Sequence, residues 1–316
     1  DGPTISTNFG ENAQNRTYQD LLKNKFDEHN FEQLSTSAIY KVSIDGDVKK
    51  WMDDGMYRTI SFSPNGEYVM ISQINKPFSY LVTYSRFPTE TNVYSKDGNF
   101  ISNLLNVPLI EELPKGFMSA RTGKRSFSWR PDKGASLTYV TALDSGDPSK
   151  KVDFRDEVYE LNYPFLGKGK FMLKTINRFS GIDWGTKDMA IAYDTWWNTR
   201  NRKSYMFNPS NPNIKPKIIS DRNYQDTYSD PGVFLRSRNE FNRSVLKMHY
   251  GNVFLRGQGF SPNGQFPFID KVNTKTFEKT RVYQSSYTDK IESIIDYDPK
   301  KNQLTVSIES PSEYPN

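Results

Sequence analysis

The sequence contains no cysteine, two histidines, seven alanines and no apolar run of the roughly 18 residues that a membrane-spanning helix needs. The missing cysteines exclude disulfides, thiolate nucleophiles and thiolate metal sites. Neither His29 nor His249 lies in a recognisable triad motif, so we interpret both as structural or surface residues. Gly-x-Ser-x-Gly and phosphate-binding glycine loops are also missing. The sequence therefore predicts no catalytic residue, cofactor or metal site in this chain.

The charge balance gives no sign of a nucleic-acid or membrane partner. There are 42 basic and 37 acidic residues, for a net charge of +5, and the two signs are interleaved along the chain. A nucleic-acid-binding protein usually carries a denser basic stripe. We therefore interpret the charges as a mixed, solvated surface.

Aromatic and turn-forming residues are abundant instead. The chain has 21 Phe, 19 Tyr and 5 Trp, together with 26 Asn, 19 Gly and 18 Pro. Alanine, the best helix former, is scarce, whereas aromatic residues favour strands and Asn, Gly and Pro favour turns. The composition predicts an all-β protein of short strands joined by tight turns.

A strand–turn–strand unit recurs along the chain. In its clearest copy a strand reaches Phe62, Pro64-Asn65-Gly66 forms the turn, and a second strand begins at Tyr68. Large aromatic residues mark the corresponding place in five copies, at intervals of 47 to 67 residues: Phe62, Trp129, Trp184, Tyr250 and Tyr297. A second hairpin turn lies between or before these copies, at Asp45-Gly46, Asp97-Gly98, Asn162-Tyr163-Pro164, Asn208-Pro209 and Asn273-Thr274.

Two hairpins in each unit make four antiparallel strands, and repeated four-stranded units are typical of a β-propeller. In that architecture an aromatic ring at each of the five positions fills the space between adjacent blades. The sequence thus predicts a propeller of about five blades, or an arc of a larger one, over residues 37–316. Residues 1–36 are predicted to be a polar segment, loosely ordered over 1–16, followed by a short amphipathic helix within 18–33 that packs on the propeller.

The two ends of the propeller do not complete whole units. Residues 37–51 are interpreted as the outer two strands of one blade, and residues 291–308 as the inner two strands of another. The two halves either pair to close a five-bladed ring or leave two open edges.

The most unusual local segment is 196–205, where two tryptophans precede several cations. In a structural interpretation the tryptophans pack between blades and the arginines face water. In a functional interpretation, cations beside aromatic rings hold a carboxylate or a peptide, which makes these residues the candidate substrate contacts: Trp196, Trp197, Arg200 and Arg202.

Acidic residues leave a different function open. Five-bladed propellers can hydrolyse glycosides with carboxylates that meet near the axis. The available acids are Asp53, Asp54, Glu111, Glu112, Asp183 and Asp296, and nothing in their spacing brings any two together. A free-standing glycoside hydrolase and a stand-alone protein- or peptide-binding propeller remain alternatives.

Several ordered segments resemble the glutamyl endopeptidase branch of the prolyl oligopeptidase family. The likeness runs from about Tyr18 to about Ser310, and the segments that carry it are Met56-Tyr57-Arg58, Phe62 to Gly66, Lys76 to Tyr80, Arg86-Phe87-Pro88, Gly181 to Gly185, Ala190 to Arg200, Asp226 to Gly232, Gly257-Gln258-Gly259 and Pro267-Phe268. Members of that family join a β-propeller to a C-terminal α/β-hydrolase domain that carries Ser, Asp and His.

The resemblance implies that this chain is a non-catalytic propeller that gates and guides peptides to a hydrolase domain of the same polypeptide, absent here. No triad residue can be carried over. The resemblance also implies cleavage after glutamate, for which Arg200 or Arg202 is a conceivable cation. It places the protein outside the cytoplasm, in the periplasm or the exterior.

Overall fold

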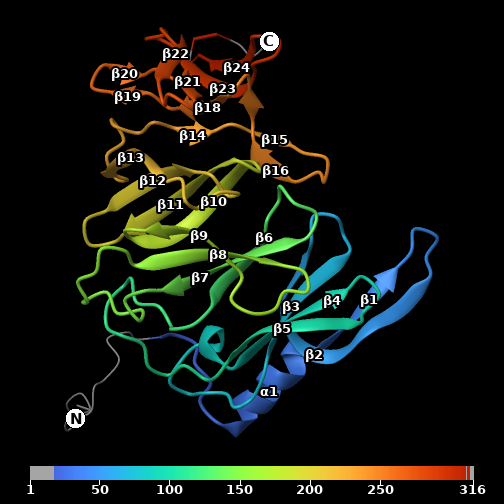
Figure 1. The fold of residues 1–316 in the computed structure, drawn as a ribbon. Coiled ribbons are helices and arrows are strands. Elements are labelled where there is room, and N and C mark those ends of the chain that lie inside the picture. Colours follow the sequence, from blue (N-terminus) through green and yellow to red (C-terminus); the bar gives the residue numbers. More distant parts are fainter. Residues whose placement is uncertain (1–17, 311, 314–316) are drawn as a thin grey trace.

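The computed structural model describes residues 18–310, 312 and 313, and over this range the chain is almost entirely antiparallel β-structure with a single α-helix (Figure 1). The prediction of an all-β propeller of four-stranded blades is confirmed. The prediction for residues 1–16 lies outside the described range. No helix in the described part is long and apolar enough to cross a bilayer.

The sheets follow one another in chain order, and the first three are antiparallel meanders. The first contains β1 (Ser37–Val42), β2 (Val48–Phe62), β3 (Tyr68–Ile74), β4 (Thr89–Ser95) and β5 (Phe100–Val107). The second contains β6 (Arg125–Trp129), β7 (Ser136–Ala142), β8 (Asp156–Asn162) and β9 (Lys170–Thr175). The third contains β10 (Arg178–Thr186), β11 (Met189–Trp196), β12 (Asn201–Phe207) and β13 (Lys217–Asn223).

The remaining sheets are less regular. The fourth contains β14 (Val233–Phe234), β17 (Met248–His249), β18 (Asn252–Gly257), β21 (Phe268–Asn273) and β22 (Lys279–Gln284). The last contains only β23 (Ile291–Asp298) and β24 (Gln303–Glu309). Two small hairpins, β15 (Arg236–Arg238) with β16 (Ser244–Leu246) and β19 (Phe260–Ser261) with β20 (Gly264–Gln265), extend from the fourth sheet, and a short 3-10 turn, η1 (Tyr84–Arg86), precedes β4.

Strand register identifies the equivalent aromatic positions. The residue that pairs with the second residue of the second blade strand is an aromatic in four sheets: Phe62 with Val69, Trp129 with Leu137, Trp184 with Ala190, and Tyr297 with Leu304. In the fourth sheet this residue is Met248, which pairs with Val253. The prediction for Tyr250 was wrong.

Tyr250 fails as an anchor because β17 ends one residue before it. It lies in the turn at a φ of +44°, beside Gly251, and 89% of its surface is exposed. Trp129, Trp184 and Tyr297 are all buried, whereas Phe62 is 53% exposed. The rings of Trp129, Trp184 and Tyr297 point toward the sheet that precedes each of them. No sheet precedes the first one in the described part of the chain, so Phe62 has no such neighbour.

Apolar clusters fill the spaces between consecutive sheets. Trp129 and Leu137 of the second sheet pack against Met70 and Val93 of the first. Trp184 of the third sheet packs against Val140 and other residues of the second. Clusters of the same kind join the third sheet to the fourth and the fourth to the last. The sheets are therefore stacked face to face in chain order, as blades are.

A hairpin of the fourth sheet shows that the first strands of the blades converge. This hub hairpin (residues 236–246, β15 and β16) packs beside β10 of the third sheet. The Asn239 side chain donates to the Pro131 carbonyl of the second sheet at 2.7 Å, and the Arg243 guanidinium donates to the Phe62 and Ser63 carbonyls of the first at 3.2 and 3.3 Å. Contacts with three other sheets at once require a common centre, which confirms the radial arrangement.

The two ends differ from the prediction in one respect. Residues 291–308 do form a two-stranded sheet, but residues 37–51 are no separate half-blade. Strand β2 continues without a turn from Val48 to Phe62, so its first part pairs with β1 and its second part with β3. In the described chain β1 and β24 belong to different sheets, so the two halves do not pair to close a ring.

Helix α1 (Lys25–Ser35) covers the first sheet and begins later than the predicted 18–33. The Asn24 side chain caps it by accepting from the backbone N–H groups of Phe26 and Asp27, which explains the late start. Phe31 stacks edge-on against Phe78 and Phe87, with centroids 5.1 and 5.7 Å apart. The predicted packing of this helix on the propeller is confirmed.

Candidate functional site

All connections between consecutive blade sheets emerge on one face of the propeller. Because neighbouring strands run in opposite directions, the turn after the first strand of each blade lies on one face, and the connection to the next blade leaves from the other. We call the second face the loop face; it carries segments 108–124, 176–177, 224–232 and 285–290. Helix α1 and the candidate residues Trp196 and Trp197 lie toward it.

A cleft of about 1170 Å³ separates the third and fourth sheets. Its walls come from β10 to β13 on one side and from β14, β18 and the 229–236 segment on the other. Apolar residues such as Leu255 and Phe277 line it together with charged ones, and its volume is slightly above the usual range for ligand sites. It is large enough to hold several residues of an extended peptide.

Most charges in the cleft are paired within the protein. Asp183 accepts from the Arg236 guanidinium and from the Tyr193 hydroxyl, the latter at 2.8 Å. Burial and the Asp183 carboxylate raise the pKa of Tyr193 far above its ordinary value, so this phenol stays protonated. Hydrogen bonds from Lys203 and Asn201 lower the pKa of Asp221, which keeps it ionised.

Among the four predicted site residues, Arg202 is the one that lines the cleft. It lies on β12, lines the cleft, and its guanidinium is 4.9 Å from the centre of the Tyr193 ring. Among the described residues no carboxylate forms an ion pair with it, and its side chain is exposed. A cation held over an aromatic face beside a cleft is suited to binding an anionic group.

The structure separates the other three predicted residues from Arg202. Trp197 lies outside the cleft lining, with Arg200 stacked 3.7 Å from its ring centre and Phe117 at 5.4 Å. The Arg155 guanidinium lies 3.9 Å over the Trp196 ring. Trp196 and Arg202 lie on paired strands, but the register places Arg202 opposite Thr195 and Trp196 opposite Asn201, so their side chains point to opposite faces of the sheet.

The acids that could have served glycoside hydrolysis are also dispersed. Asp53 and Asp54 lie on exposed β2 beside Lys50, and Glu111 accepts from the Ser79 hydroxyl. Asp183 and Asp296 both line the cleft, but each is neutralised, the first by Arg236 and the second by Lys247 at 2.6 Å. Nothing in this arrangement provides an acid and a nucleophile.

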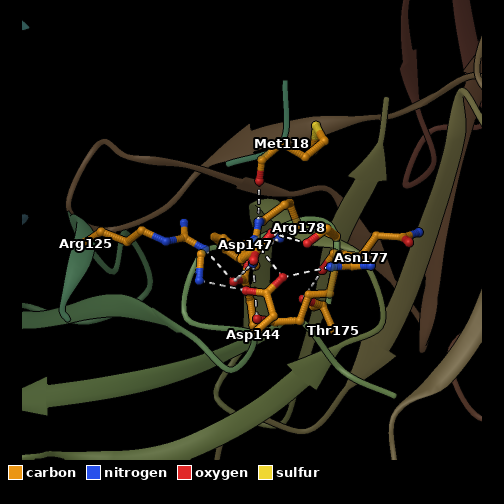
Figure 2. Close-up of polar contacts among 12 residues, drawn as sticks. Met118, Arg125, Asp144, Asp147, Thr175, Asn177 and Arg178 are labelled. Carbon is orange, nitrogen blue, oxygen red and sulfur yellow. Dashed lines mark hydrogen bonds and ion pairs between the residues drawn. The ribbon is translucent and has the colours of Figure 1, made fainter. Parts of the chain in front are cut away.

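A buried ionic network between the second and third sheets was missed by sequence reasoning (Figure 2). Arg178, at the start of β10, donates to Asp144 at 2.7 Å, to Asp156 at 3.1 Å and to the Met118 carbonyl at 2.8 Å. Arg155 and Arg125 pair with the same two carboxylates, which have no exposed side-chain surface. Burial alone would raise the pKa of Asp144, but the Arg178 and Arg155 hydrogen bonds outweigh it and hold that pKa below its ordinary value.

Each member of this network stands at the end of a different strand or in a loop, so no local sequence pattern could have grouped them. The only local signal was the turn Asp144-Ser145-Gly146, in which the Asp144 side chain accepts from the Gly146 N–H at 2.9 Å. Because its carboxylates are fully buried and bind arginines from both sheets, we interpret the network as a fastening between blades.

Comparison with known sequences found two plant proteins with clear similarity. A protein named probable glutamyl endopeptidase, chloroplastic, from Oryza sativa subsp. japonica is 36% identical over 302 residues, which is 93% of this chain and 32% of that protein. The protein of the same name from Arabidopsis thaliana is 32% identical over 303 residues, with the same two shares. This chain therefore spans about a third of the length of these relatives. No family model matches it.

Solved structures give weaker similarities. The β-propeller domain of the Trilobed protease from Pyrococcus furiosus has a TM-score of 0.40 and 11% identity, over 81% of this chain and 70% of that one. Oligopeptidase B from Trypanosoma brucei has a TM-score of 0.42 and 9% identity, over 88% of this chain and 36% of that one. The fold assignment above depends on the sheet order, the register and the hub hairpin of this chain, and not on these scores.

Proposed function

We propose that this chain is the non-catalytic propeller of a serine peptidase, because almost its whole length is similar to proteins named probable glutamyl endopeptidase, as its sequence resemblance predicted. In this proposal it gates and guides peptides to an α/β-hydrolase domain on the same polypeptide. The observation that carries it is the similarity to a third of each relative, which leaves ample length for a separate catalytic domain. Restriction of access by a covering domain is an established way to protect an active site from water and from folded proteins.

We propose that peptides are guided along the cleft between the third and fourth sheets. The cleft between the third and fourth sheets is lined by residues near the loop face, and its mixed apolar and paired polar lining suits an extended peptide. We propose that the loop face is the side turned to the hydrolase domain. For the location in the cell we propose a compartment outside the cytoplasm, in the periplasm or the exterior; the names of the plant relatives assign those proteins to the chloroplast.

Two experiments test the domain assignment. The 316-residue chain alone should not cleave glutamate-containing peptides, whereas the polypeptide translated from the whole parent gene should. The parent reading frame should also continue into a Gly-x-Ser-x-Gly segment. Peptidase activity of this chain alone, or a parent frame without a serine nucleophile motif, would overturn the proposal.

Arg202 is the residue we propose as a contact for a glutamate side chain, since it is the predicted cation that reaches the cleft. In the full-length enzyme, Arg202→Ala should lower kcat/KM for a glutamate substrate relative to its glutamine counterpart by about tenfold, because one charge-assisted hydrogen bond is lost. Arg200→Ala is the matched control and should leave this ratio nearly unchanged, since Arg200 stacks on Trp197. An unchanged Glu-to-Gln ratio in Arg202→Ala would refute the contact without affecting the domain assignment.

The glycoside hydrolase alternative finds no support in the dispersed acids. A stand-alone peptide-binding propeller would use the same cleft, and it is distinguished from the main proposal by the parent gene alone. A screen of the chain against aryl glycosides completes the comparison, and turnover there would favour the first alternative.

A further inference from the structure

A second, smaller cavity of about 290 Å³ lies between the first and second sheets, toward the loop face. Its floor is apolar and includes Met70, Phe87 and Phe127. It is separate from the cleft described above and shares no lining residue with it. This volume is at the lower end of the range for ligand sites, so it suits a small ligand or a single functional group.

The polar lining of this cavity is entirely cationic or neutral. Arg58, Arg86 and Arg121 line it, together with the hydroxyl groups of residues such as Ser72 and Thr91. Among the described residues that line it, none is acidic. Ser72 and Thr91 share one hydrogen bond at 2.7 Å, and both are buried or half-buried. The lining therefore offers guanidinium and hydroxyl donors and contains no carboxylate.

The bonds that Arg58 and Arg121 make are to neutral oxygens. Arg58 donates to the Ser85 carbonyl at 3.4 Å, a long bond, and Arg121 donates to the carbonyls of Thr122 and Lys124. Burial, and then the nearby positive charge of Arg125, lower the pKa of Arg121, although it remains a cation at neutral pH. Positive charge accumulates here without a counter-charge in the lining.

The two buried arginines of the described residues are paired differently. Arg130 pairs with Asp132 and Glu160, and Arg178 pairs with Asp144 and Asp156. These two arginines are buried, and each is paired with carboxylates, as burial of a charge requires. Arg121 is half-buried and Arg58 is exposed, and neither has a carboxylate partner among the described residues, so an external anion would supply the missing counter-charge.

We propose that this cavity is a binding site for a small oxyanion, a carboxylate or a phosphate, held by the Arg58 and Arg121 guanidinium groups and by the surrounding hydroxyls. Guanidinium groups bind both kinds of anion through paired, charge-assisted hydrogen bonds. This proposal does not depend on the proposed peptide guide, because the site is a different cavity between different blades.

Isothermal titration calorimetry on the 316-residue chain tests this directly, with inorganic phosphate, glutarate and neutral glutaramide as the three probes at constant ionic strength. We expect one site for phosphate or glutarate and no binding of glutaramide. Arg58→Met and Arg121→Met should each weaken the anion about ten- to a hundredfold, since each removes charge-assisted hydrogen bonds. Comparing phosphate with glutarate identifies which anion the site prefers.

Arg238→Met is the matched control. Arg238 is exposed, donates to the Asn242 carbonyl at 3.0 Å and lines neither cavity, so this variant loses the same charge without touching the site. It should bind the anion as the wild type does. Equal affinity in all three variants, or no anion binding at millimolar concentrations, overturns the proposal. Circular dichroism checks folding, and exposed Arg58 keeps the test decisive if Arg121→Met does not fold.

Discussion

Arg178→Met should lower the free energy of unfolding by about 3–5 kcal/mol, the typical cost of removing one partner from a buried ion pair. The variant keeps most of the side-chain volume but leaves Asp144 and Asp156 buried with one arginine fewer. It also removes the hydrogen bond to the Met118 carbonyl, which lies in the segment that connects the first sheet to the second. Urea denaturation followed by tryptophan fluorescence measures the change.

Lys96→Met is the control, since Lys96 forms an ion pair with Glu67 at 3.0 Å in which both side chains are about half exposed. Exposed pairs of this kind contribute little, so this variant should unfold almost as the wild type does. If Arg178→Met is no less stable than Lys96→Met, the network does not fasten the blades.

The same network sets a pH dependence. The pKa of Asp144 is lower in the folded protein than in the unfolded chain, so the folded protein releases this proton at lower pH. Its contribution to stability is therefore complete above the ordinary carboxyl pKa of about 4 and is lost as the pH falls through the lowered value. The stability difference between wild type and Arg178→Met should accordingly be largest near neutral pH and should shrink in acid.

Trp129→Ala should cost a similar amount, about 3–5 kcal/mol, because it removes a large buried ring between the first and second sheets. The ring packs against Phe165 with centroids 5.5 Å apart, and its Nε1 donates to the Ser61 carbonyl at 3.0 Å. The variant would leave a cavity at the interface of two blades and would remove the hydrogen bond from the indole to the Ser61 carbonyl. Equilibrium denaturation again provides the measurement.

Tyr250→Ala is the instructive comparison, since the sequence pattern places Tyr250 and Trp129 at equivalent positions and the structure does not. With its side chain almost fully exposed, its loss should change stability little. Equal costs for the two substitutions would mean that Trp129 does not act as a wedge between blades.

The fold was predictable from the sequence because its signals are local. Turn residues such as Asp97-Gly98 and Pro64-Asn65-Gly66 mark hairpins directly, and Gly98 indeed has a positive φ of 89°. An aromatic before each turn marks the blade repeat. The pattern failed at Tyr250 because the equivalent position in the fourth sheet is Met248, which is not aromatic. It failed at residues 37–51 because nothing local distinguishes a blade edge from an extension of β2.

The candidate sites were predictable only in part. Arg202 stood out because it lies in a run of tryptophans and cations, and that run is visible in the sequence. The oxyanion cavity draws Arg58 from the first sheet and Arg121 from the connection to the second, so only the stacking of blades brings them together. The partners of Arg178 are distant for the same reason. Contacts between separate blades leave no trace in a single sequence.

The hub hairpin has a mechanical consequence. Asn239 and Arg243 tie it to the first two blades, and Arg236 ties it to the third, all near the axis. Hinging between neighbouring blades is thus restrained at the centre and less restrained at the outer rim. If the cleft guides peptides as proposed, a wide peptide would enter by outward movement of the outer strands, with the inner ends of the blades as the pivot.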